Sequence, residues 1–210
     1  MTKRENAKGR IYISGAFRTV NPARCSAGEA WIDNDPHFWT RPPTWGICRT
    51  DLRKLVKQDD YAFFVLPKCS ELGTENQMVY GYICARQDPI THIEAYTRPE
   101  LKGKRMRRAA PGRPNGNIIV RADGRYNKLD GNEDHRRRFH RIKEYYVIGD
   151  ERRSRFLKEE EIKRLAPGFP EVLRQVFGDD GRTVFDIVSK WGRVMEEDQV
   201  KGLLTWLDDG

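Results

Sequence analysis

Residues 59–66 read Asp-Asp-Tyr-Ala-Phe-Phe-Val-Leu, so two acidic residues lead directly into six apolar ones. A short run that is apolar on both faces is typical of a strand that is covered on both sides. A second run of this kind, Met-Val-Tyr-Gly-Tyr-Ile-Cys-Ala, follows at residues 78–85. These two runs predict successive strands of a β core.

Weaker patterns extend the core along the chain. Residues 10–15, 117–121 and 145–149 predict further strands, and residues 50–56 predict a short helix. The basic, Gly- and Pro-rich residues 97–116 predict a mobile loop. From residue 158 the pattern is amphipathic and helical, over 158–165, 170–177, 183–191 and 196–207. We therefore expect an α+β fold, with a small, mostly antiparallel β domain over residues 1–157 and an acidic helical extension over 158–210.

The positive charge is concentrated in the middle of the chain. The 210 residues carry a formal net charge of +8, but residues 98–155 alone hold 18 basic and 8 acidic side chains. Clustered Lys and Arg attract nucleic acid by releasing its counterions, although such a run can also be a solvated loop. Contacts to a nucleic-acid backbone are expected from Lys102, Lys104, Arg105, Arg107, Arg108, Arg136, Arg137, Arg138 and Arg141.

A second group of residues has the chemistry to hold a base or a phosphate. Arg49 and Arg53 lie four apart, on one face of the expected helix, and a guanidinium fork suits a phosphate or a guanine edge. Trp45 ends a polar loop that also carries Trp31 and Trp39, and Asn117 has an amide that can pair with adenine. The alternatives are a helix-capping arginine pair, a small core under the loop, and a turn Asn that satisfies backbone groups.

An enzyme remains the alternative function. Its catalytic residues would be Cys48 as a nucleophile and His135 with Asp134 or Asp60, provided that a base lowers the pKa of the thiol. A buried Cys and a solvent-exposed His explain the same residues more simply. The chain has no Walker loop, no GxGxxG before a helix and no GxSxG elbow, which argues against an ATPase, a dinucleotide enzyme and a serine hydrolase.

Other patterns exclude several classes of site. Cys25, Cys48, Cys69 and Cys84 are scattered without a CxxC pair, so we expect no metal and no cofactor. No run approaches the roughly 18 apolar residues of a membrane helix, and the polar N-terminus lacks a signal peptide. A cytoplasmic protein without a membrane partner is expected, whose C-terminal helices offer a surface for a protein partner.

The order of elements around residue 60 resembles that of PUA-like barrels, the group that includes the EVE, ASCH and YTH domains. Those domains have a helix, an acidic turn, a Phe-rich strand and a second strand, as in Leu52 to Ala85 here. Asp60 stands where they often carry an Asp, with Asp59 in place of their Gly. The resemblance implies a small PUA-like barrel.

Short motifs are similar to those of the nucleotide-modification-associated domain family, second type. Residues 45–53, Trp-Gly-Ile-Cys-Arg-Thr-Asp-Leu-Arg, resemble its Cys-Lys-Pro-x-Ile-Arg box, and residues 116–119, Gly-Asn-Ile-Ile, resemble its Gly-Asp-Asn-Ile-Tyr box. Residues 146–157 resemble its late strand and the turn that follows. The resemblance implies a nucleic acid, DNA rather than RNA, or a nucleotide as ligand. Its context is base modification or phage defence, and it leaves open whether the domain recognises a modified base or makes one. We expect a module that recognises a modified or flipped base, with an enzyme that modifies a nucleotide or a base as the alternative.

Overall fold

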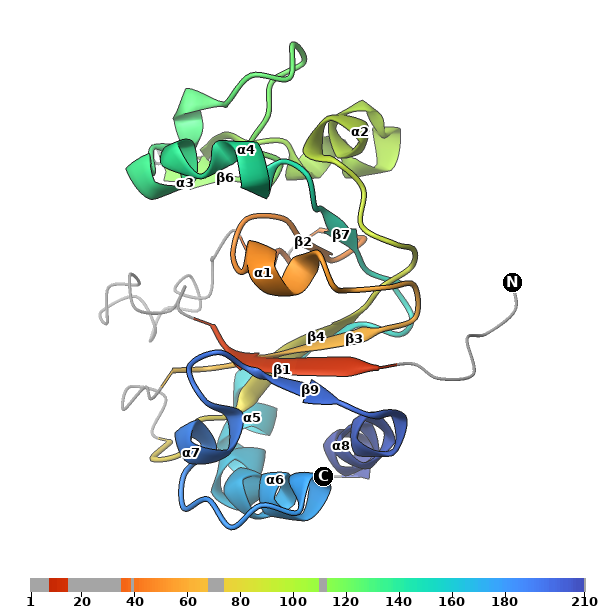
Figure 1. Cartoon of the computed structure of the whole chain (residues 1–210), viewed down its shortest axis with the longest axis vertical. Helices are drawn as coiled ribbons and strands as arrows, with labels where there is room; N and C mark the ends of the chain where they lie inside the picture. Colours follow the sequence, from red (N-terminus) through yellow and green to blue (C-terminus); the bar gives the residue numbers. More distant parts are fainter. Residues whose placement is uncertain (1–7, 15–34, 39, 68–73, 110–112, 210) are drawn as a thin grey trace. The chain divides into compact units, whose positions relative to one another are not determined.

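The computed structural model describes residues 8–14, 35–38, 40–67, 74–109 and 113–209. The chain forms two compact units (Figure 1). The first unit draws on residues 1–31, 59–84 and 154–210, and the second on residues 32–58 and 85–153. The chain thus passes from one unit to the other several times, and the expected boundary at residue 157 does not separate them.

The first unit contains a five-stranded, mostly antiparallel sheet with the order β8-β4-β3-β1-β9. Its strands are β1 (Gly9–Ile13), β3 (Tyr61–Val65), β4 (Val79–Cys84), β8 (Arg155–Phe156) and β9 (Arg193–Met195). Among the strand pairs described for this sheet, only β1 and β3 run parallel. Within the described residues the sheet is open, with β8 and β9 as its edges, and the fold is mixed α and β.

The two apolar runs form the centre of this sheet, as the sequence predicts. Phe63 of β3 lies opposite Ile11 of β1 on one side and Tyr82 of β4 on the other. Phe63 and Ile11 are fully buried, and the rings of Phe63 and Tyr82 are 5.5 Å apart. Burial on both faces explains why these strands carry apolar residues at successive positions rather than at alternate ones.

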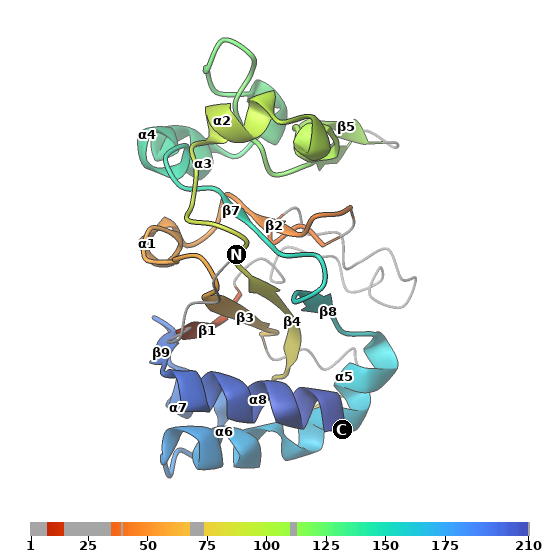
Figure 2. The same cartoon turned by 90° about the vertical axis from the view of Figure 1, so that its right-hand side faces the viewer.

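Helices cover one face of the sheet in the first unit (Figures 1 and 2). They are α5 (Glu159–Leu165), the 3₁₀ helix η6 (Ala166–Gly168), α6 (Phe169–Phe177), α7 (Val184–Val188) and α8 (Glu197–Asp209). The backbone of Gly9 in β1 approaches α8 closely, because a Cβ at this position would lie 2.5 Å from Val200. The extension expected at residues 158–210 is therefore mainly helical, but it also supplies the edge strand β9.

The second unit is built from short elements. They are β2 (Thr44–Trp45), α1 (Thr50–Arg53), α2 (His92–Thr97), η4 (Pro99–Lys104), β5 (Arg107–Ala109), β6 (Arg113–Asn115), η5 (Lys128–Asp130), α3 (Glu133–Arg137), α4 (Phe139–Ile142) and β7 (Val147–Ile148). β2 pairs with β7, and β5 pairs with β6, both antiparallel. Ala95, Leu101, Ile118 and Tyr146 belong to one buried cluster.

Two expectations for the second unit are corrected. The described part of residues 97–116, which the sequence predicts as a mobile loop, contains η4 and the β5–β6 hairpin. Residues 117–121 form no continuous strand, since Ile118 and Val120 make only isolated bridges, to Arg105 and Tyr126. Residues 117–120 are apolar, apart from Asn117, because they cross the core of the unit.

Candidate functional site

A buried carboxylate holds the backbone that leads into α1. Asp35, 2% exposed, accepts hydrogen bonds from the backbone N–H groups of Gly46, Ile47 and Cys48. Asn117 donates a fourth hydrogen bond to Asp35, from Nδ2 to Oδ1 at 3.0 Å. Both oxygens of the carboxylate are therefore used twice, and they fix three successive amides in space.

The buried side chains of His92 and Arg53 donate hydrogen bonds to the carbonyl groups of the same three residues. His92 donates from Nε2 to the carbonyl oxygen of Gly46 at 2.7 Å, because its Nδ1 accepts from the backbone of Ile119. Arg53 donates to the carbonyl oxygens of Ile47 and Cys48, both at 2.9 Å. Every backbone N–H and C=O group of residues 46–48 is thus bonded to a buried side chain. We call Asp35, Arg53 and His92 with residues 46–48 the polar clamp.

Burial and the neighbouring clamp residues shift the pKa values of Asp35 and His92. Burial raises the pKa of the Asp35 carboxyl above its ordinary value, and the Arg53 guanidinium and the hydrogen bonds from Gly46, Cys48 and Asn117 oppose that rise. Burial, together with the nearby Arg53 guanidinium, lowers the pKa of His92 to about 3. His92 is therefore neutral at physiological pH, which agrees with an imidazole that accepts at one nitrogen and donates at the other.

Arg49, which directly follows residues 46–48 of the clamp, has an unusual backbone conformation. Arg49 precedes α1 with φ 52° and ψ 52°, in the left-handed region, which costs a residue with a Cβ about 1–2 kcal/mol. Its guanidinium forms a fork with Asp51, from Nε and Nη2 at 3.0 and 2.8 Å. Strain of this kind persists where the surroundings over-determine it, often at functional sites.

Arg49 lines a pocket that α1 shares with α4. We call it the α1–α4 pocket; its volume is about 510 Å³. Its lining residues are Arg49, Thr50, Asp51, Lys54, Arg138, His140, Arg141, Glu144 and Tyr145. Residues that are about ninety positions apart in the sequence therefore meet here, and they include three of the predicted ligand residues, Arg49, Arg138 and Arg141.

Ion pairs divide the charges of this pocket into two groups. Each acidic residue of the lining has a basic partner, since Asp51 pairs with Arg49 and Glu144 pairs with Lys143. Arg138 pairs with Asp134. Lys54 and Arg141 are exposed and have no acidic partner among the described residues. The pocket thus leaves two cations available to an anion, in a half-enclosed space where electrostatic attraction is stronger than on a flat surface.

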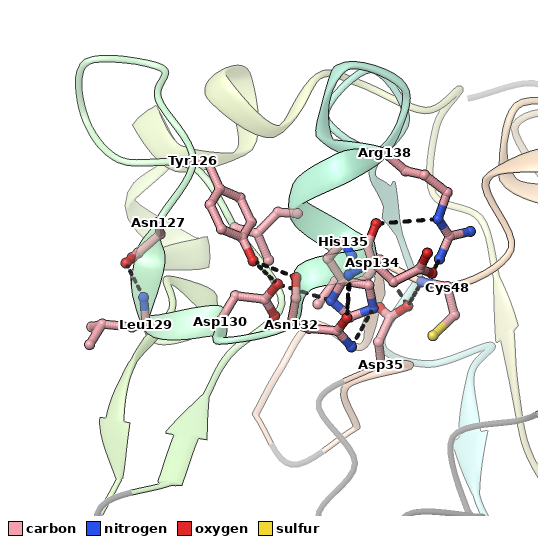
Figure 3. Close-up of polar contacts among 12 residues, drawn as sticks. Asp35, Cys48, Tyr126, Asn127, Leu129, Asp130, Asn132, Asp134, His135 and Arg138 are labelled. Carbon is pink, nitrogen blue, oxygen red and sulfur yellow. Dashed lines mark hydrogen bonds and ion pairs between the residues drawn. The ribbon is translucent and has the colours of Figure 1, made fainter.

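The structure separates the proposed catalytic residues. His135 bonds to Asp130 through Nδ1 at 2.9 Å, and its Nε2 lies 3.4 Å from Asn132 (Figure 3). Asp130 also accepts from the hydroxyl of Tyr126 at 2.6 Å, and burial, with that bond, raises the pKa of Tyr126 well above its ordinary value.

Asp134 bonds to arginines of its own helical segment rather than to His135. Asp60 lies in the first unit, where it accepts from the backbone of Lys8. The two ring nitrogens of His135 face Asn132 and Asp130 rather than Cys48, so the hydrogen bond expected between nucleophile and base is not among those of His135 in the described part of the chain.

Most of the residues predicted to hold a base or a phosphate are internal. Trp45, Arg53 and Asn117 are fully buried. Asn117 uses its whole amide, because its Oδ1 accepts from Thr44 and Tyr146 while its Nδ2 donates to Asp35 and to the carbonyl of Thr44. The structure therefore places these three residues in the core and not in a ligand pocket. Trp31 and Trp39 lie outside the described residues.

The expected backbone-binding residues divide in the same way. Lys104 is fully buried, and its ammonium donates to the carbonyls of His37 and Thr40 and contacts His37 Nδ1 at 3.0 Å. Burial lowers its pKa to about 7, against the opposing charge of Glu151. Arg105 donates to the carbonyl of Tyr96 and lies over its ring. These two residues are structural.

The other basic residues remain accessible where they are described. Lys102 and Arg107 are exposed, and the side chain of Arg108 lies outside the described residues. Arg136 and Arg137 are also exposed but pair with Glu133 and Asp134. The expected backbone-binding residues fall in two groups, at 102–108 and at 136–141. The second group contributes Arg138 and Arg141 to the lining of the α1–α4 pocket, and the first contributes none of the lining residues described.

Asp35, His92, Lys54 and Tyr145 belong to the site but were not among the predicted site residues. Asp35 and His92 give no sequence signal because their partners lie 11 and 46 residues away. Lys54 and Tyr145 are one basic and one aromatic residue beside charged runs, and no pattern in the sequence indicates that they line the same pocket. Within the described residues, no group of three or more His, Cys, Asp or Glu side chains is placed to hold a metal ion. No helix in the described part is long and apolar enough to span a membrane.

Comparison with known proteins adds no family to this picture. A scan against protein-family models gives no match to the chain. A search of curated proteins gives none. A search of solved structures also gives none.

Proposed function

We propose that this protein is a nucleic-acid-binding module that holds its ligand at the α1–α4 pocket. The observation that carries the proposal is that Lys54 and Arg141 line one pocket without an acidic partner among the described residues. Lysine and arginine gathered in a concave site attract phosphate groups and release counterions from the nucleic acid when it binds.

The sequence motifs support a particular ligand. The resemblance of residues 45–53 and 116–119 to the nucleotide-modification-associated domain family favours DNA over RNA. It also favours a modified or flipped base as the recognised feature, in base modification or phage defence, with a free nucleotide as the simplest related ligand. The structure supports a different set of contact residues from the expected one, since Arg49 lines the pocket while Trp45 and Asn117 are internal.

The experiment is a binding titration of charge-reversed variants. Fluorescence anisotropy with labelled oligonucleotides, plain and carrying modified bases, is measured over a salt series for the wild type, Lys54→Glu and Arg141→Glu. We expect each substitution to weaken binding about tenfold, and to lower the slope of log K against log salt by about 1, as the loss of one phosphate contact does.

Lys128→Glu is the matched control. It makes the same change in net charge on an exposed lysine of η5, outside the α1–α4 pocket. We expect it to bind within about twofold of the wild type. If all three variants lose the same affinity, the attraction comes from the overall charge of the chain and the pocket is not the site.

The PUA-like barrel belongs to the same proposal. The order of α1, the acidic turn at Asp60, β3 and β4 along the chain matches the order that the resemblance implies. A barrel would require a closing pairing beyond the open sheet of the described residues. Backbone amide contacts measured by NMR would test it, since closure predicts contacts from an edge strand, β8 or β9, to a further strand.

A further inference from the structure

We propose that the α1–α4 pocket accepts a single unpaired nucleotide, and that the protein therefore prefers single-stranded nucleic acid to a duplex. The base would stack on Tyr145, and its phosphates would contact Lys54 and Arg141. This inference rests on the proposed function and adds the form of the ligand to it.

The first argument is the state of Tyr145. It follows α4 and lines the pocket, and its side chain is only half-buried. Its hydroxyl has no hydrogen-bond partner, and its ring stacks on no other ring, among the described residues. The neighbouring aromatic residues differ, since Tyr146 packs against His92 and Phe139 packs against Tyr126. Tyr145 thus lines the pocket with a partly exposed ring that stacks on no other ring among the described residues, and such rings stack on bases of any sequence.

The second argument is the position of the charges around this ring. Arg141 lies four residues before Tyr145, and Lys54 reaches the same pocket from the end of α1. The Arg49 guanidinium is occupied by its fork with Asp51, so it forms a wall of the pocket rather than a free phosphate ligand. An aromatic ring and two available cations in one pocket are the combination that single-strand-binding grooves use.

The third argument is the shape of the pocket. A volume of about 510 Å³ belongs to the range of sites that enclose one small ligand. A base in a duplex is stacked and paired, and it can enter a concave site only after it leaves the helix. An unpaired base enters without that cost. The shape of the pocket therefore favours single strands whatever their base sequence.

The test compares one sequence in three forms with the wild-type protein. The forms are a labelled single-stranded DNA, the same strand annealed to its complement, and the same strand with abasic sites in place of its central bases. We expect the single strand to bind at least tenfold more tightly than either of the others, since stacking on one ring is worth about this factor. A single-stranded RNA of the same sequence shows whether the sugar matters.

Two variants connect this preference with the ring. Tyr145→Ala should lose about tenfold on the single strand and little on the duplex, whereas Tyr145→Phe should bind as the wild type does. Equal binding of the three DNA forms by the wild type would overturn the inference, even if Tyr145→Ala fails to fold. The proposed function would then still stand if Lys54→Glu and Arg141→Glu weaken binding while Lys128→Glu does not. It fails with the inference if no form binds at low salt.

Discussion

Replacing Asp35 by Asn should release the backbone that precedes α1. The substitution keeps the size of the side chain and turns one of its two oxygens into an NH₂ donor. Each oxygen accepts two hydrogen bonds, Oδ1 from Gly46 and Asn117, and Oδ2 from Ile47 and Cys48. Whichever way the amide turns, two buried donors then face a donor.

The size of the effect follows from those two lost bonds. A hydrogen bond to a charged group contributes about 1.5–3 kcal/mol, so two of them contribute about 3–6 kcal/mol. Burial disfavours the ionised carboxylate that is removed, as the raised pKa of Asp35 indicates, and this offsets part of the loss. A net cost of about 3 kcal/mol is expected, which corresponds to an opening equilibrium roughly a hundredfold larger.

Hydrogen exchange measures this opening directly. The amides of residues 46–48 should exchange roughly a hundredfold faster in Asp35→Asn, while the amides of α8, in the first unit, keep their protection. Asp123→Asn is the control, because Asp123 is exposed and accepts one exposed amide hydrogen bond, from Arg125. If the amides of residues 46–48 change by less than threefold in a folded Asp35→Asn protein, the clamp does not hold this segment and the reasoning is wrong.

Three further predictions concern the same unit. The free energy of unfolding should decrease as the pH falls from 6.5 towards 3, by up to about 1.4 kcal/mol per pH unit, because His92 takes up a proton near pH 6.5 when unfolded but only near pH 3 when folded. Urea denaturation across this range measures it, and a flat profile would contradict the buried neutral imidazole. Between pH 7 and 10.5 the wild type should gain stability relative to Lys104→Met as the pH rises, because the folded lysine has lost its proton while the unfolded one retains it. If the difference in unfolding free energy between the two proteins is the same at pH 7 and at pH 10.5, this reasoning is wrong. Gly46→Ala should cost about 2 kcal/mol or more, because its Cβ would lie 2.5 Å from the Tyr146 ring and 2.7 Å from the carbonyl oxygen of Asn117. Thermal melting tests it against Gly103→Ala, whose nearest neighbours lie at 3.8 Å and whose Tm should not change.

The central strands and the helices after residue 158 were predictable because their signals are local, whereas α2, α3 and α4 were not predicted. Residues 61–66 and 78–85 are continuous apolar runs, and β3 and β4 occupy nearly the same positions. The amphipathic pattern of residues 170–177 gives α6, which ends at Gly178 in the left-handed conformation that glycine adopts without strain. Residues 117–121 carry a similar apolar signal, yet they form no strand. A buried segment without a partner strand can be as apolar as a strand, so composition alone does not distinguish the two.

The candidate site was predictable only as separate residues. The sequence identified Arg49, Arg138 and Arg141 as basic residues near aromatic ones, and the α1–α4 pocket contains all three. It also predicted Arg53, Lys104 and Asn117 as ligand-contacting residues, which the fold buries. Composition and charge describe what a side chain can bind, whereas its burial depends on which backbone groups the fold places within about 3 Å of it.

The sequence by itself thus determined the central strands, the C-terminal helices and the concentration of positive charge in the middle of the chain. The tertiary structure decided which of those charges face solvent and which support the backbone. It also joined Asp35, residues 46–48 and His92 in one clamp, and α1 with α4 in one pocket. The physical reason is that hydrogen bonds and ion pairs act over a few ångströms, so a pairing across tens of residues exists only after the chain has closed on itself.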